Sequence, residues 1–117
     1  MGLNIEIQGR TLVANLSGEL DHYQAERMRT QIDAAYEKSS CKHIVLNMEA
    51  VTFMDSSGIG MIIGRYKNAA KRGGKLVLAA MNEHIAKLFD ISGLAKIVSN
   101  APSTKDALLT LGGNQSE

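Results

Sequence analysis

The hydrophobic residues of this chain follow two different periods, and the change between them marks the first elements. The segments Leu3–Ile7 and Leu12–Leu16 alternate apolar and polar residues on either side of a glycine-containing break. This alternation predicts a β-hairpin. Apolar residues at helical spacing then predict an amphipathic helix from about Tyr23 to Lys38. Asp21 precedes this helix as its expected N-cap, and Gln24 completes a capping box.

Beyond this helix, short apolar runs alternate with amphipathic segments. We expect strands at His43–Met48, Lys75–Ala80 and Ile97–Val98, and helices at Ser57–Lys71, from Asn82 to Ser92, and from Ser103 to about Leu111. The element order is therefore β-β-α-β-α-β-α-β-α. This alternation indicates an α/β fold with a mostly parallel sheet and an antiparallel N-terminal edge strand. We expect one domain over residues 1–117, with an ordered core at about 3–111 and a flexible tail at 112–117.

Composition narrows the possible partners. A chain of 117 residues with a net charge of +1 and 4% aromatic residues gives no reason to expect a nucleic-acid partner. No apolar run approaches the ~18 residues of a membrane span, so no membrane partner is expected. The N-terminus does not resemble a signal peptide, and the single cysteine, Cys41, lies in no zinc-binding pattern. We therefore expect a cytoplasmic protein without a metal or another cofactor.

The segment Asp55-Ser56-Ser57-Gly58 lies between a predicted buried strand and a predicted apolar helix. Aspartate and serine are common before helices because their oxygens accept the first free N–H groups. Capping needs only one such side chain, and here three are adjacent. In parallel sheets, functional groups gather where strands end and helices begin. A serine at this position suits phosphorylation, because the helix N-terminus favours negative charge.

Three other roles for this segment fit less well. A dinucleotide-binding turn would need a glycine where Ile63 stands, and no P-loop motif occurs in the chain. A hydrolase would need a nucleophile elbow and an activating base, but the three histidines are scattered along the sequence. A receiver domain would accept phosphate on Asp55, but it needs an acidic pair after the first strand and a lysine after the last parallel strand. Neither is present.

The helix after this segment contains two glycines, Gly60 and Gly64, which weaken a helix relative to alanine. Two explanations remain open: close packing against a neighbouring helix, or a flat external face on which another protein docks. The expected sheet-facing stripe is Ile59, Ile62, Ile63, Tyr66 and Ala70. Met61 is expected opposite this stripe, where it would offer the partner an adaptable apolar contact.

Three motifs together resemble the STAS domain family, named for sulfate transporters and anti-sigma factor antagonists. They are SGELDH at 17–22, HIVLNMEAVTFMDSSGIGMIIGRYK at 43–67 and KLFDISGLAKI at 87–97. The likeness covers roughly residues 3–111, and it is greatest to the antagonists of the forespore sigma factor in spore-forming bacteria. The residues after Asn100 are the least similar, so no function is carried over to them.

This resemblance implies a non-enzymatic, partner-switching role. Unmodified antagonists of the family bind an anti-sigma factor that is also a serine kinase, and the sigma factor is released. The kinase then phosphorylates the first serine of DSSG, here Ser56, and a PP2C-type phosphatase removes the phosphate. An antagonist of a stress-response sigma pathway is the alternative within the family.

The resemblance also implies which residues surround the acceptor and contact the kinase. Asp55, Ser57 and Gly58 would shape the acceptor loop. Glu19 and Asp21 match a family segment that lies near the acceptor. Together with the helix argument, the expected partner-binding residues are Glu19, Asp21, Ile59, Gly60, Met61 and Gly64.

Overall fold

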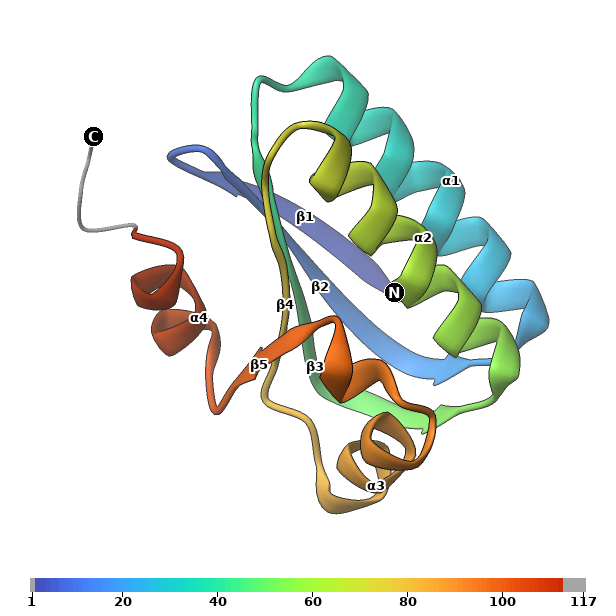
Figure 1. Cartoon of the computed structure of the whole chain (residues 1–117). Coiled ribbons are helices and arrows are strands. Elements are labelled where there is room, and N and C mark those ends of the chain that lie inside the picture. Colours follow the sequence, from blue (N-terminus) through green and yellow to red (C-terminus); the bar gives the residue numbers. More distant parts are fainter. Residues whose placement is uncertain (1, 113–117) are drawn as a thin grey trace.

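The computed structural model describes residues 2–112, which form one five-stranded sheet and four α-helices (Figure 1). The elements are β1 (Leu3–Gln8), β2 (Thr11–Leu20), α1 (His22–Lys38), β3 (His43–Met54), α2 (Ser56–Lys71), β4 (Leu76–Ala79), α3 (Glu83–Ile91), a 3₁₀ turn (Leu94–Lys96), β5 (Ser99–Ala101) and α4 (Thr104–Thr110). The predicted α/β class and element order are confirmed. Except for Gly112, the predicted tail at 112–117 lies outside the described residues.

The strands lie in the order β1-β2-β3-β4-β5, with β1 antiparallel to β2 and every other pair parallel. Strands β2 and β3 are both longer than their apolar patterns predicted. Their pairing is interrupted after Asn15 and again after Gly18, whose φ of 92° is unfavourable for other residues. Beyond this irregularity, Leu20 pairs with Met54, so both strands end at the same edge of the sheet.

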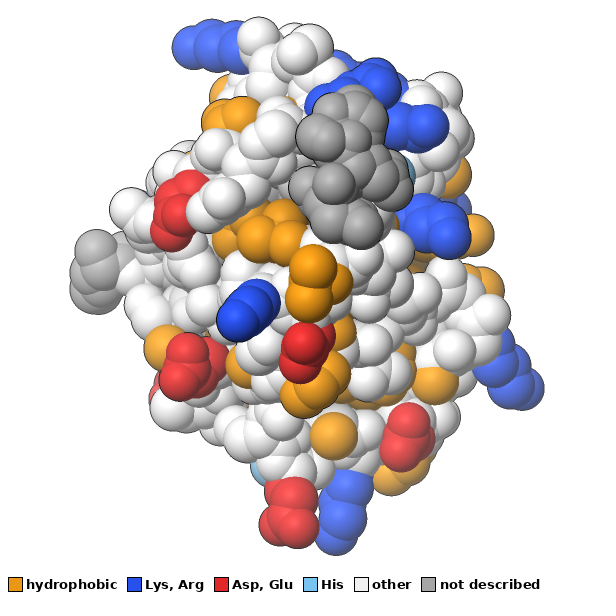
Figure 2. Space-filling view, turned by 90° about the vertical axis from the view of Figure 1, so that its left-hand side faces the viewer, with side chains coloured by type: hydrophobic (Ala, Val, Ile, Leu, Met, Phe, Trp, Pro, Cys, Tyr) orange, Lys and Arg blue, Asp and Glu red, His pale blue; other side chains and the backbone are white. Residues whose placement is uncertain are grey.

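The two faces of the sheet are covered unequally. Helices α1, α2 and α3 pack on one face, where Leu12, Ile44 and Leu46 are fully buried in the main core. Helix α4 covers part of the other face, where Ala107 packs against a smaller cluster that includes Val45 and Val77. Figure 2 shows the α4 side, on which charged side chains of both signs are scattered among exposed hydrophobic ones.

The prediction for the last strand is wrong by two residues. Ile97 and Val98 were expected to form it, but their N–H groups both donate to the carbonyl oxygen of Leu94 and close the 3₁₀ turn. Strand β5 follows at Ser99–Ala101 and pairs with β4. A three-residue edge strand is held by its backbone hydrogen bonds. Its side chains therefore need not show the apolar pattern from which a strand is predicted.

Residues 2–112 contain neither a membrane-spanning helix nor a metal-binding cluster. No helix within 2–112 combines the length and apolarity needed to cross a bilayer. Nor do these residues contain a cluster of three or more histidine, cysteine or acidic side chains placed to hold a metal ion. Cys41 is a free thiol buried in the main core.

Candidate functional site

The DSSG segment forms the junction between β3 and α2, at the edge where β2 and β3 end. Asp55 is the N-cap of α2, and its Oδ1 accepts a hydrogen bond from the Ser57 N–H at 2.8 Å. The helix therefore begins at Ser56, one residue earlier than predicted. Ser56 is exposed, whereas Asp55 and Ser57 are half-buried. Asp55 therefore caps the helix, and Ser56 remains exposed to solvent.

The second serine also has a separate contact. Ser57 Oγ lies 3.4 Å from His22 Nδ1, at the start of α1. Ser56 Oγ makes no hydrogen bond within residues 2–112. Of the two adjacent hydroxyls, only that of Ser56 is both exposed and uncommitted.

Gly58 is needed for close packing beneath this loop. A Cβ atom at this position would lie 2.5 Å from Met54 Cγ and 3.2 Å from the carbonyl oxygen of Leu20. The first turn of α2 therefore lies directly on the ends of β2 and β3, where no larger residue fits without displacement. This contact fixes the position of the first turn of α2 on the strand ends, and with it the position of Ser56.

The parallel pairing of β2 and β3 brings the predicted ELD turn beside the DSSG loop. Glu19 pairs with Phe53, and the Asp55 N–H donates to the carbonyl oxygen of Leu20 at 3.4 Å. Glu19 is exposed, and Asp21 caps α1 by accepting from the Gln24 N–H at 2.9 Å. The Gln24 side chain does not complete the predicted capping box but accepts from Arg27.

The structure corrects the predicted orientation of α2. The residues buried on this helix are Gly58, Met61, Ile62, Arg65 and Ala69. Met61, expected on the outer face, is only 4% exposed, and Ala70, expected in the core, is exposed. Ile59, Ile63 and Tyr66 are half-buried at the margin of the core. The buried stripe is rotated because α2 packs against α1 as well as against the sheet.

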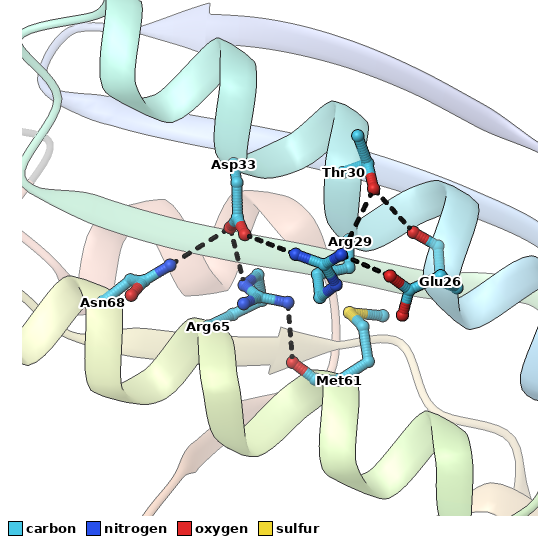
Figure 3. Close-up of polar contacts among 7 residues, drawn as sticks. All are labelled: Glu26, Arg29, Thr30, Asp33, Met61, Arg65 and Asn68. Atoms are coloured by element: carbon cyan, nitrogen blue, oxygen red, sulfur yellow. Dashed lines mark hydrogen bonds and ion pairs between the residues drawn. The ribbon is translucent and has the colours of Figure 1, made fainter.

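Arg65 is the residue that hydropathy could not place in this interface. It is 5% exposed and points from α2 towards α1, where its Nε lies 3.0 Å from Asp33 Oδ1 (Figure 3). The Nε–H is not directed at that oxygen and makes no hydrogen bond, while Nη1 donates to the carbonyl oxygen of Met61 at 3.3 Å. The Arg65–Asp33 contact is therefore an ion pair without a hydrogen bond. Burial lowers the pKa of Arg65, and the carboxylate of Asp33 opposes this shift.

The same network extends along α1. Asp33 also accepts from Asn68 Nδ2 at 3.1 Å and lies 3.5 Å from Arg29 Nη1. Arg29 in turn pairs with Glu26, one turn earlier (Figure 3). The spacing of Arg29 and Asp33, four residues apart, is a sequence signal for an ion pair. Nothing in the sequence indicated that Arg65 joins them.

Gly60 and Gly64 border a cleft of about 270 Å³ between α1 and α2. A Cβ atom on either glycine would meet no atom within 4 Å outside its own helix backbone and chain neighbours. Close internal packing, one of the two explanations left open by the sequence, therefore does not account for these glycines. The cleft is lined by His22, Ala25, Glu26, Arg29, Ser57, Gly60, Met61, Gly64 and Arg65. His22, Arg29 and Arg65 were not among the predicted site residues.

The sequence matches the family described as "STAS domain" over residues 2–107. The chain belongs to the STAS domain family. This STAS domain is 41% identical over 113 residues to the anti-sigma F factor antagonist of Paenibacillus polymyxa, covering 95% of this chain and 97% of the relative. It is 33% identical over 100 residues to the anti-sigma-B factor antagonist of Bacillus subtilis, covering 84% and 90%.

A solved structure of similar sequence has the same fold as this STAS domain. The Bacillus cell fate determinant SpoIIAA, solved in its phosphorylated form, superposes with a TM-score of 0.72 at 30% identity. The superposition covers 92% of this chain and 96% of the other. The resemblance inferred from the three motifs is therefore confirmed for the family and for the fold.

Proposed function

We propose that this STAS domain is an anti-sigma factor antagonist that acts by partner switching in sporulation. Its unphosphorylated form binds an anti-sigma factor serine kinase and so releases the sigma factor. Phosphorylation of Ser56 ends this binding, and a PP2C-type phosphatase restores it. The chain is then a regulator and a kinase substrate, with no catalytic step of its own, and it works in the cytoplasm.

One observation supports this proposal above the others. The Ser56 hydroxyl is exposed and uncommitted at the start of α2, while its two neighbours cap the helix and contact α1. A phosphate there adds about −1.5 to −2 charges close to the free N–H groups and the positive end of the helix dipole. The fold tolerates this modification, so the added bulk and charge act on the partner.

The proposed contact surface surrounds this hydroxyl. Asp55, Ser57 and Gly58 shape the loop, and Glu19 and Asp21 lie next to it on the β2 side. Helix α2 continues the surface through Ile59, Gly60 and Gly64, and Met61 contributes from the floor of the cleft rather than from an outer face.

The decisive experiment is phosphorylation by the cognate anti-sigma factor kinase with ATP. Wild-type protein should gain one acid-stable phosphate, and Ser56→Ala should gain none. Ser57→Ala is the matched control, because it removes the neighbouring hydroxyl and leaves the acceptor. An acid- and base-labile phosphate on Asp55 would contradict the proposal and favour a receiver-like mechanism.

A stress-response pathway is a second candidate, favoured by the 33% identity to an antagonist of sigma-B. The two candidates differ only in the partner. Binding measurements against each anti-sigma factor encoded in the same genome would separate them, and we expect the tightest binding to the sporulation kinase.

A further inference from the structure

The cleft between α1 and α2 contains two features that the fold itself does not explain. The first is the open space over Gly60 and Gly64, where side chains would fit without meeting a neighbour. A helix with alanine at both positions would be more stable. Their absence of side chains leaves this space open to a group from outside the domain.

The second feature is an arginine with unused donors. Arg65 is 5% exposed and lines the cleft, yet its Nε–H has no hydrogen-bond partner within the described residues. Nη1 donates to Met61, and Nη2 makes no hydrogen bond within residues 2–112. A buried guanidinium usually has most of its five N–H groups paired. Nε itself is buried and lies 3.0 Å from Asp33 Oδ1, so an acceptor brought by a partner would pair with Nη2, the donor that has no hydrogen bond within the described residues.

The charges that line the cleft indicate what this acceptor is. Arg65 and Arg29 both line it, and Glu26 is the only carboxylate among the lining residues. Asp33 is not among the lining residues, but it contacts both arginines, at 3.5 Å from Arg29 and 3.0 Å from Arg65. Guanidinium groups bind carboxylates through paired hydrogen bonds in a fixed planar geometry.

We propose that the α1–α2 cleft receives one acidic side chain of the anti-sigma factor kinase, which enters over Gly60 and Gly64 and pairs with Arg65 and Arg29. This inference rests on the proposed function, since the occupant belongs to the kinase that reaches Ser56. Ser57 lines the cleft, so the inserted carboxylate holds the kinase in register with the adjacent acceptor serine.

The first test fills the cleft. Gly64→Leu places a side chain in the open space, and Ala70→Leu is the matched control on an exposed position of the same helix outside the cleft. Isothermal titration with the purified kinase should give a Kd weakened by at least about tenfold for Gly64→Leu. The control should bind as wild type does, and thermal melts should confirm that both variants fold.

The second test identifies the acidic side chain. Arg29→Gln is combined in double-mutant cycles with the amide variant of each interface aspartate and glutamate of the kinase. Arg29 is chosen because it is partly exposed, so its replacement spares the buried pair of Arg65 and Asp33. One kinase carboxylate should couple to Arg29 by about fivefold or more in Kd, and Arg29→Lys should retain part of the binding.

Unchanged affinity of Gly64→Leu, or no coupling to any kinase carboxylate, would overturn the proposal for the cleft. Phosphorylation of Ser56 in the wild-type protein, measured in the same experiments, keeps this failure distinct from a failure of the proposed function. If the kinase neither binds nor phosphorylates the wild-type chain, the proposed function itself is wrong.

Discussion

Arg65 Nε on α2 lies 3.0 Å from Asp33 Oδ1 on α1, and this ion pair joins the two helices that flank the cleft. Asp33 receives a second contact from α2, the hydrogen bond from Asn68. Arg65 is 5% exposed. Its buried positive charge therefore depends on Asp33, its one carboxylate partner among the described residues. Removing one member of such a pair leaves the other buried without compensation.

We predict that Asp33→Ala lowers the free energy of unfolding by roughly 2–3 kcal/mol. The loss is smaller than for a fully buried pair because Asp33 is 24% exposed and water screens part of the interaction. Urea denaturation measures it, with Glu26→Ala as the control. Glu26 pairs with Arg29 on the surface of α1, so its removal should change stability little. Equal effects of the two variants would show that the Arg65–Asp33 pair has no special role.

Replacing each of the three glycines of α2 by alanine should change the free energy of unfolding, with one sign for Gly58 and the opposite sign for Gly60 and Gly64. Gly58→Ala would place a Cβ atom 2.5 Å from Met54 Cγ and should cost about 1–3 kcal/mol. Gly60→Ala and Gly64→Ala meet open space, and each should stabilise the protein by about 0.5–1 kcal/mol. Thermal unfolding monitored by circular dichroism distinguishes the signs. A destabilised Gly60→Ala would mean that internal packing requires this glycine.

Much of the fold could be predicted because local patterns and tertiary structure agree. Asp21, Asn82 and Ser103 were each expected as N-caps, and each accepts a backbone N–H in the first turn of its helix. Capping is a local interaction between residues two or three positions apart, so the sequence contains all of its partners. The hairpin and the alternation of strands and helices are local in the same sense.

The errors concern contacts between distant segments. The expected stripe of α2 did not include Arg65, yet Asp33, 32 positions earlier in the chain, makes its burial possible. Met61 was misplaced for the same reason, because the helix packs against α1 as well as against the sheet. The requirement for Gly58 comes in part from a remote contact with Leu20, in addition to the nearer Met54, four residues earlier in the chain. Such contacts form only when folding brings distant segments together. A short stretch of sequence therefore does not reveal them.

Asp55 caps α2, and its replacement can separate capping from phosphorylation. Asp55→Ala should lower the free energy of unfolding by about 1 kcal/mol, whereas Asp55→Asn keeps an oxygen for the Ser57 N–H and should be nearly neutral. Because we assign the phosphate to Ser56, Asp55→Asn should still be phosphorylated by the kinase. Mass spectrometry of the reaction products locates the phosphate. Its complete loss in Asp55→Asn would favour the carboxylate as the acceptor.

His43 links stability to pH at the opposite end of β3. Burial lowers the pKa of His43, and the positive charges of Lys42, Arg10 and Lys75 lower it further. Its Nδ1 accepts a hydrogen bond from the Lys75 N–H at 3.0 Å, a contact that only the unprotonated nitrogen can make. In the unfolded chain, by contrast, the imidazole titrates near its ordinary pKa of about 6.5.

As the pH falls through about 6.5, the unfolded chain binds a proton that the folded chain does not, so the contribution of His43 to stability is lost towards lower pH. We predict that the free energy of unfolding decreases between about pH 7.5 and 5.5, and that His43→Asn reduces this decrease, because its side-chain oxygen accepts from Lys75 at either pH. Urea denaturation across this range provides the measurement. His84→Asn, at an exposed position on α3, should retain the wild-type dependence. If the two variants kept identical slopes, His43 would not be the group that couples folding to protonation.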